Sequence, residues 1–414
     1  MKLHPWTDVG SVHSSLTNLE DETEILLLRP RSVDALGMTI LFLCHGDCLC
    51  KEQQGYVRAF GRQGARLAFV PNGFPANGDL DQLLRRCCET PFLIVHPELQ
   101  PVLPVGLADV SIPTVCFQID TYAYTRHRIA WSKLFDYSVL FHPGFEDRFR
   151  NAGHPAPLTF AHAVQAERFL GPEKQRIFEI GWVGRVEGPM YEARRRVLPI
   201  LGKYFRMNRW KQAYAEEEVA EVYRQSEVVV NIGRDDYPQD ANLRVFEAMA
   251  AGALLITSLP SELTQLGFRE GTHFLGYRHE SELVGLVRKH LGNQAFLRRL
   301  AETGREKVLR EHTYDCRVKA LVERVKQDGG RLIAPARNWK RERISMHYLD
   351  YYSAHSNLDC AYAELRRIGR GHVLASAMGG CLIARALTRN WQRRAFHSYV
   401  ENLKRLTKPL RSGA

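Results

Sequence analysis

Short apolar runs alternate with amphipathic stretches along most of the chain, beginning at Met38. The run MTILFLCH ends at Gly46, a helical pattern follows over 52–62, and RLAFVP is a second apolar run. The alternation continues to about residue 164, with apolar runs in PFLIVHPE, TVCFQID, DYSVLFHP and LTFAHAV. Short apolar runs separated by helices are typical of buried strands in a parallel sheet that helices cover on both faces. The pattern therefore predicts a doubly wound α/β unit.

The alternation starts again near Gly171 and Pro172, which indicates a domain boundary. FEIGWVG, YFRM, EVVVNIG, ALLITS and THFLGY are predicted strands, with helices between them and a long helical region to about Lys326. Two successive α/β units predict two facing Rossmann-like domains. We expect an N-terminal extension over 1–37, a first domain over 38–170, a second domain over 171–330 and a basic helical extension over 331–414.

The net charge of +11 on 414 residues is concentrated at the carboxyl end. Residues 331–414 contain 16 Lys or Arg and 5 Asp or Glu, so the first 330 residues are neutral overall. A nucleic-acid enzyme usually carries its basic surface around its cleft, so no nucleic-acid partner is expected. The extension is predicted either as a solvated helical tail or as a contact with an anionic membrane or another acidic surface, and the sequence leaves both open.

Composition places the chain among globular cytoplasmic proteins. With 45% hydrophobic and 25% charged residues, a mostly disordered or collagen-like protein is excluded. The start MKLHPWTDVG lacks the pattern of a secretory signal, and no apolar run reaches the roughly 18 residues of a membrane span. Nine cysteines without regular spacing indicate a reducing compartment, and CHGDCLC fits no zinc spacing. We expect a cytoplasmic location, either free or peripheral on the cytoplasmic face of the membrane.

Two segments of the second half lie beyond predicted strand ends, where open parallel sheets bind ligands. In GWVGRVEGP, Gly184 permits close approach of an anion and Arg185 offers a fork to phosphate; an ordinary turn is the alternative. In DDYPQDANLRVFEAMAAG, Asp240 is the predicted N-cap of a helix whose first N–H groups would hold a diphosphate. Arg244 would then meet phosphate and Glu247 a ribose diol, unless the two form an ordinary exposed pair.

The segment VYRQSEVVVNIGRDDYPQDANLRVFEAMAAGALLITS resembles the nucleotide-sugar site of GT-B glycosyltransferases. It is most similar to the spore-maturation-protein-like branch, related to glycosyltransferase families one and four. That branch shows a Tyr-rich helix, a strand ending in Asn, and an Asn-x-Arg-x-Phe-Glu-Ala helix followed by Ala-x-Gly. The matching positions are Tyr223, Ser226, Asn231, Asn242, Arg244, Phe246, Glu247, Ala248 and Gly252, and WVGRVEGPMYEARRRVLPIL adds Arg185 and Arg194.

The resemblance extends over about 178–325, is fainter over 113–169, and is absent before residue 38 and after about 326. It implies sugar transfer from a nucleotide-diphosphate sugar to a glycan, lipid-linked or protein acceptor, without a metal or a further cofactor. The donor site expected from the motifs and the resemblance together comprises Gly184, Arg185, Tyr223, Asn231, Asn242, Leu243, Arg244 and Glu247.

One position departs from the family pattern. Family-four enzymes commonly carry Glu-x7-Glu, whose second Glu corresponds to Glu247, whereas Gln239 stands at the first position. Gln can bind a sugar hydroxyl but carries no charge, so the sequence leaves open whether the transfer retains or inverts configuration. Gln239 and Glu247 are candidate catalytic residues together with Asp120. Asp120 follows the apolar run TVCFQI and is a candidate general base if burial desolvates it; a helix cap is the alternative.

The first domain is expected to supply the acceptor contacts. Asp235 and Asp236 are adjacent, without the spacing of an Asp-x-Asp metal motif, so no metal site is predicted. Two alternatives for the whole chain stay open: a glycosyltransferase-like nucleotide-binding scaffold without turnover, and a nucleotide-sugar epimerase. The acceptor-side candidates at predicted strand ends are His45, Gly46, Asp47, His96 and His127, of which His127 also has a structural reading.

Overall fold

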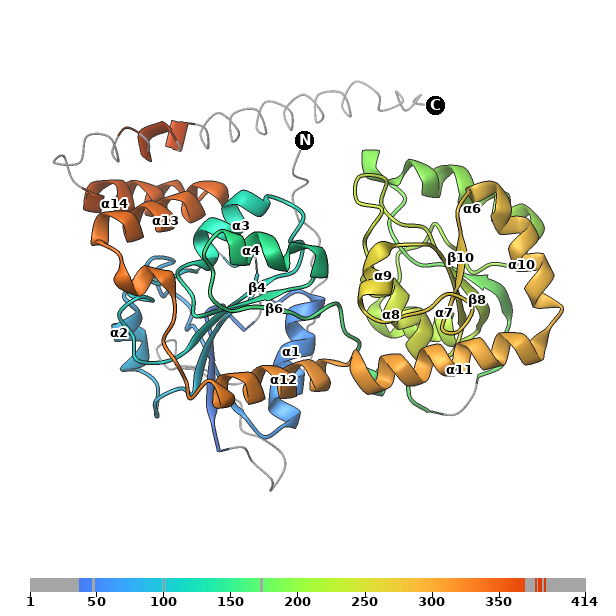
Figure 1. Cartoon of the computed structure of the whole chain (residues 1–414), viewed down its shortest axis with the longest axis horizontal. Helices are drawn as coiled ribbons and strands as arrows, with labels where there is room; N and C mark the ends of the chain where they lie inside the picture. The colour runs from blue at the N-terminus through green and yellow to red at the C-terminus, as the bar shows by residue number, and fades with distance from the viewer. Residues whose placement is uncertain are drawn as a thin grey trace, which may run out of the picture.

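The computed structural model describes residues 37–368, apart from 47, 48, 99, 101, 172 and 173, together with 377, 379–381 and 383–384. Almost all of the predicted N-terminal extension, and most of residues 369–414, lie outside the described residues. Two α/β domains stand side by side (Figure 1). Each contains its own parallel sheet, so the predicted fold class is confirmed.

The first domain is built on a six-stranded parallel sheet with the order β2-β1-β3-β4-β5-β6. Every residue of β1, β3, β4 and β5 is buried, as expected for strands that are covered on both faces. The strands are β1 (Thr39–Phe42), β2 (Arg66–Phe69), β3 (Leu93–His96), β4 (Thr114–Gln118), β5 (Tyr137–Leu140) and β6 (Pro157–Thr159). Their helices are α1 (Lys51–Arg62), α2 (Leu80–Leu84), α3 (Thr125–Ser132) and α4 (Glu146–Asn151), with the short turn η1 (Pro143–Phe145) after β5.

The second domain contains a four-stranded parallel sheet with the order β10-β9-β8-β7. The predicted strand YFRM is absent from this sheet, because only Met207 forms an isolated bridge, to Ile180. The strands are β7 (Phe178–Gly181), β8 (Ser226–Asn231), β9 (Leu254–Ser258) and β10 (Leu275–Tyr277). The helices are α5 (Ala166–Phe169), α6 (Glu192–Tyr204), α7 (Glu216–Arg224), α8 (Leu243–Ala250), α9 (Ser261–Gln265), α10 (Leu283–Leu291) and α11 (Gln294–Glu311).

The chain crosses between the domains twice, and the two crossings are hydrogen-bonded to each other. The first crossing follows β6 and the second lies between α11 and α12 (Tyr314–Gln327). The amide of Val164 donates to the carbonyl of His312 at 2.9 Å, and the amide of Tyr314 donates to the carbonyl of Val164 at 3.2 Å. The connection between the domains is therefore a pair of chain segments rather than a single linker.

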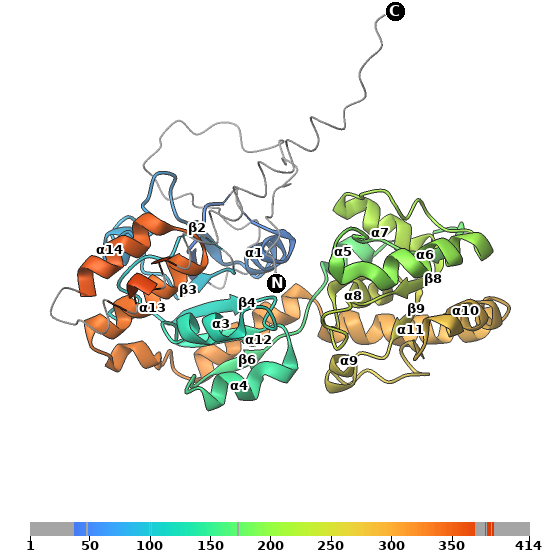
Figure 2. The same ribbon diagram turned by 90° about the horizontal axis from the view of Figure 1, so that it is seen from above.

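The helices after the second crossing return to the first domain. The sequence predicts α12 as part of the second domain, whereas α12 packs against α1 and adds Tyr314, Val318 and Leu321 to the first-domain core (Figure 1). Helix α13 (Arg341–Ala354) packs on α3, and α14 (Leu358–Ile368) packs on α13 (Figure 2). The described part of the predicted extension is helical, but it is an integral layer of the first domain rather than an appendage, because its buried tyrosines complete the core.

A buried ion pair fastens this returning chain to the first sheet. Arg337, in the turn η4 (Pro335–Asn338), donates from Nε and Nη2 to the two carboxylate oxygens of Asp136, each at 2.9 Å. Asp136 is fully buried and also accepts from the amides of Thr114 (2.9 Å) and Ala334 (2.8 Å). A two-pronged guanidinium–carboxylate pair is among the stronger polar contacts in proteins, so it fixes where the returning segment docks.

Replacing this arginine should weaken the first domain. In Arg337→Met the buried carboxylate loses its cationic partner, and we expect the free energy of unfolding to fall by about 3 kcal/mol in urea titrations. The matched control is Arg85→Met, whose pair with Asp81 is exposed and should contribute nothing measurable. Equal effects of the two substitutions would show that the Arg337 pair does not hold the returning chain.

Candidate active site

The amino end of α8 lies at the boundary between the domains. A narrow cavity there is lined by Leu243 and Glu247 of α8, by Lys51 of α1, and by residues of the crossing after β6. The N-cap of α8 is Asn242, whose side-chain oxygen accepts from the amide of Arg244 at 3.2 Å. The prediction of Asp240 as the cap is wrong, because the helix begins at Leu243.

Arg244 is held against the glycine turn that follows β7. Its Nε donates to the carbonyl of Val183 at 2.6 Å. A Cβ atom at Gly184 would lie 2.7 Å from this Nε, so only glycine leaves room for the arginine. The sequence predicts separate contacts of Gly184 and Arg244 with an anion, and the structure brings the two residues together.

A second, buried arginine lies near Arg244. Arg194 of α6 is 1% exposed and donates to the carbonyls of Ile232 and Arg185, each at 2.9 Å. Burial and the charge of Arg244 lower the pKa of Arg194 to about 9. Within the described part of the chain, no carboxylate forms an ion pair with either guanidinium. Positive charge is therefore concentrated beside the amino end of α8, where the helix dipole adds to it.

Glu247 faces the first domain. The carboxylate is 5% exposed and its Oε1 lies 2.5 Å from Nζ of Lys51. Burial by itself lowers the pKa of Lys51, but the carboxylate of Glu247 has a larger effect in the other direction. The pKa of the lysine is therefore raised. The sequence did not point to Lys51; its position directly after the β1–α1 connection, at a strand's carboxyl side, is the signal that could have identified it.

Three of the predicted donor residues carry buried polar atoms without a hydrogen-bond partner among the described residues. They are the hydroxyl of Tyr223, Oδ1 of Asn231 and Nδ2 of Asn242. Burial raises the pKa of Tyr223 above its usual range, with Glu247 adding to the effect. The side-chain nitrogen Nδ2 of Asn231 donates to the hydroxyl of Thr257 at 2.9 Å. Buried polar atoms are normally paired, so these atoms mark positions where ligand groups can bind.

The two remaining second-domain candidates are at the surface. Gln239 is exposed, and its carbonyl accepts from the amide of Glu262 at 3.4 Å. Arg185 is also exposed, and Arg194 binds its carbonyl. Both side chains can reach a ligand from the solvent side.

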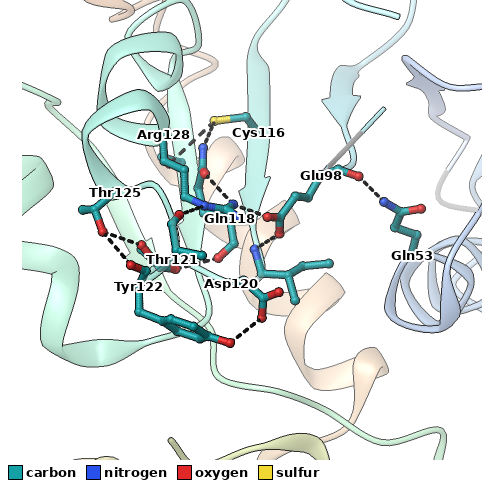
Figure 3. Close-up of polar contacts among 12 residues, drawn as sticks. Gln53, Glu98, Cys116, Gln118, Asp120, Thr121, Tyr122, Thr125 and Arg128 are labelled. Atoms are coloured by element: carbon teal, nitrogen blue, oxygen red, sulfur yellow. Dashed lines mark hydrogen bonds and ion pairs between the residues drawn. The ribbon is translucent and has the colours of Figure 1, made fainter. Parts of the chain in front are cut away.

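Asp120 lies two residues beyond β4 and is half-buried. Its Oδ1 accepts from the hydroxyl of Tyr122 at 3.3 Å (Figure 3). The carboxylate of Glu98 accepts from the amide of Ile119 and pairs with Arg128, which fixes the backbone directly before Asp120 (Figure 3). Burial, opposed by Arg128, raises the pKa of Glu98 to about 7.

Asp120 also belongs to the domain boundary. It accepts from Tyr122, whose ring stacks on that of Tyr237 in the second domain with centroids 4.3 Å apart. Asp120 therefore lies next to the domain boundary, as expected for a residue that follows a strand of the first sheet.

The first-domain histidines separate into different environments. His45 is half-buried with Nδ1 3.2 Å from the carbonyl of Val70, Gly46 is exposed, and Asp47 lies outside the described residues. His96 is fully buried among aromatic rings, where burial lowers its pKa to about 3. His96 is therefore a core residue rather than an acceptor-side residue, although it stands at the end of β3.

His127 contacts the returning chain instead of the cleft. Its Nδ1 lies 2.9 Å from the carboxylate of Asp350 on α13. This contact docks α13 onto α3 and agrees with the structural reading of His127; its role on the acceptor side stays a prediction.

Sequence reasoning missed a second polar cluster at the domain boundary. His142 and His162 follow β5 and β6, which are neighbours in the first sheet, and they approach Asp240 and Glu262 of the second domain. Both histidines stand directly after apolar runs that the sequence identifies as strands, so the strand-end rule contained the signal for them.

Comparisons with known proteins agree with this architecture. Residues 185–323 match a protein family described as glycosyl transferase-like. HepE of Anabaena, in complex with UDP, is 12% identical with a TM-score of 0.50, over 70% of this chain and 100% of HepE. A glycosyltransferase of Rickettsia africae is 10% identical with a TM-score of 0.50, over 70% of this chain and 98% of the other. The sucrose-phosphate synthase of Thermosynechococcus elongatus is 15% identical with a TM-score of 0.47, over 70% and 98% of the two chains.

No curated protein sequence matches the chain. None of these likenesses distinguishes the spore-maturation-protein-like branch, which stays a prediction. The family match is carried by the second domain, and the likeness to the solved structures concerns the fold. Residues 185–323 thus match the glycosyl transferase-like family, and the fold of the chain is similar to that of HepE and of the Rickettsia africae glycosyltransferase.

Proposed function

We propose that this protein transfers a sugar from a nucleotide-diphosphate sugar whose diphosphate binds at the amino end of α8. The observation that carries the proposal is the pair of arginines there, Arg244 and the buried Arg194, neither of which forms an ion pair with a carboxylate of the described residues. A helix amino end and guanidinium groups without a carboxylate partner together attract anions. HepE was solved with UDP, so uridine diphosphate sugars are the first donors to test.

In sugar transfer, the departure of the diphosphate is the step that most needs stabilisation by the protein. As the bond between the anomeric carbon and the diphosphate oxygen breaks, negative charge develops on the diphosphate. The two guanidinium groups and the helix dipole stabilise this charge, so the proposed step needs no metal ion at the diphosphate. Glu247 accepts from the ribose hydroxyls once the donor displaces Lys51, and the unpaired Tyr223 hydroxyl binds a further polar group of the donor.

Asp120 is the proposed general base on the acceptor side. It takes the proton from the acceptor hydroxyl as that oxygen attacks the anomeric carbon, and the attack from the face opposite the diphosphate inverts the configuration. Gln239 is compatible with this scheme because an uncharged amide can bind a sugar hydroxyl without acting as a base.

Removing Arg244 tests the donor site. Arg244→Ala should lower kcat/KM by about 100-fold or more and weaken binding of the nucleoside diphosphate, because charge on the leaving group loses a stabilising partner. The measurements are thermal shifts with UDP, GDP, ADP and dTDP, and transfer or hydrolysis of the matching nucleotide sugars.

The control is Arg298→Ala, an exposed arginine of α11 that should leave both readouts unchanged. A folded native chain that binds no nucleoside diphosphate would refute the proposal. A native chain that binds a nucleotide without any turnover would identify a scaffold.

Replacing Asp120 tests the acceptor side. Asp120→Asn should reduce kcat by about 100-fold or more while the affinity for the nucleoside diphosphate stays the same, because only proton transfer is lost. Tyr122→Phe removes one hydrogen bond to Asp120 and should have a much smaller effect. Near-native turnover of Asp120→Asn, or a product of retained configuration, would exclude Asp120 as the base.

Contact with an anionic membrane surface is proposed for the basic carboxyl end. Among the residues that the structure describes, no helix has the length and apolar composition to cross a bilayer. Residues 385–414 carry eight Lys or Arg and one Asp or Glu. Because residues 335–368 belong to the first-domain core, a truncation that tests the contact has to begin after residue 384.

Deleting residues 385–414 should weaken binding to phosphatidylserine-containing vesicles by more than about tenfold, since each basic residue near such a surface contributes about 1 kcal/mol. Binding of the full chain should also fall as salt is raised. Vesicle sedimentation measures both effects, with neutral phosphatidylcholine vesicles as the control. Salt-insensitive binding, or equal binding of the truncated chain, would contradict the proposal.

A further inference from the structure

Three buried side chains from the two domains converge at the boundary, next to the segment that leads into α8. His142 and His162 come from the first domain, and Asp240 comes from the second. Each offers one atom with a lone pair, and these atoms lie within 4.8 Å of one another. The residues are 1%, 7% and 7% exposed, respectively. The convergence depends on the packing of the domains, because residues 142 and 162 are far from residue 240 in the sequence.

Each of the three residues carries a buried polar atom that has no hydrogen-bond partner among the described residues. The atoms are Nε2 of His142, Nδ1 of His162 and Oδ1 of Asp240. Native structures leave few buried polar atoms unpaired, so three in one cluster require an explanation. Imidazole nitrogens and a carboxylate oxygen can all present lone pairs, so a cation is a ligand that suits the three side chains.

Glu262 of α9 prepares His142 for such a ligand. Nδ1 of His142 donates to the carboxylate of Glu262, with distances of 3.0 and 3.1 Å to its two oxygens. Glu262 is held in turn by the hydroxyl of Tyr237 at 2.8 Å and by the amide of Ala241 at 2.9 Å. A carboxylate that accepts the Nδ1 proton leaves the lone pair on Nε2, which is the arrangement found around metal-binding histidines.

Aromatic rings enclose the cluster from both domains. Tyr122 of the first domain stacks on Tyr237 of the second with ring centroids 4.3 Å apart, and both rings contact His142, at 5.0 and 5.4 Å. Phe141 contacts His162 at 5.3 Å. An apolar shell of this kind limits access of solvent and strengthens the binding of a charged ligand to the polar atoms inside it.

We propose that His142, His162 and Asp240 bind one divalent transition-metal ion, with Zn²⁺ as the best fit, and that the ion joins the two domains. Two imidazoles and one carboxylate with a fourth position open are a ligand set that suits Zn²⁺, whereas Mg²⁺ and Ca²⁺ prefer oxygen ligands. The site differs from the sequence-based expectation of no metal. It adjoins the proposed donor site, because Asp240 stands two residues before the cap of α8, but it shares none of the residues that hold the diphosphate.

The test measures metal binding by the full chain without any sugar donor. After treatment with a chelator, the chain is titrated with Zn²⁺ by calorimetry and with Co²⁺ by absorption. We expect one equivalent of each metal, a tetrahedral Co²⁺ spectrum without a thiolate charge-transfer band, and a rise of the melting temperature with Zn²⁺.

Matched variants assign the ligands. His162→Gln and Asp240→Asn should each weaken Zn²⁺ binding by about 100-fold or more, and Glu262→Gln by about 10- to 100-fold, since it acts through His142. The control is His154→Gln, an equally buried histidine of the first domain outside the cluster, which should bind Zn²⁺ as the native chain does.

Three results would overturn the proposal: no stoichiometric metal binding, unchanged binding in the ligand variants, or a thiolate band that assigns the metal to cysteines. Circular dichroism establishes that each variant is folded. If His162→Gln does not fold, the isosteric Asp240→Asn decides the question. Failure of this test leaves the proposed sugar transfer untouched, because donor binding is measured separately through Arg244.

Discussion

The carboxylate of Glu262 connects the two domains at the point from which the candidate site is built. It accepts from His142 of the first domain and, within its own domain, from the amide of Ala241 and the hydroxyl of Tyr237. The chain directly ahead of α8 is thereby fixed, and the helix starts at Leu243 with Asn242 as its cap. The positions of the arginine and the glutamate further along α8 follow from this start.

Polar contacts across the boundary and the paired crossings have complementary effects. The contacts of Lys51 with Glu247 and of His142 with Glu262 join the domains beside the candidate site, and the crossings at Val164 and Tyr314 are bonded to each other. Both sets of contacts hold the two domains together.

The order of the strands and helices could be predicted from the sequence, because the alternation of apolar runs is a local property. The glycine turn at Gly184 and the helix with Arg244 and Glu247 could be predicted for the same reason: each is contained in one short segment. The structure places them together at the boundary, as the strand-end rule requires. Their roles in catalysis stay predictions.

Features that depend on distant segments could not be predicted in this way. The cap of α8 is Asn242 rather than Asp240, and Asp240 lies instead in a cluster with histidines of the other domain. His96 ends a predicted strand and His127 lies near the start of a helix, positions at which site residues are often found. Both side chains contact α13, and no local pattern in the sequence reveals that α13 docks on the first domain. The same docking hides the true extent of the first domain.

That docking has a consequence for the order in which the protein matures during synthesis. The first domain's sheet is complete once β6 has left the ribosome, but the side chains of α12 and α13 that cover it are translated only after the whole second domain. The nascent first domain therefore exposes apolar surface while the second domain is being made. Domains generally fold in the order of translation, and here the amino-terminal one is finished last.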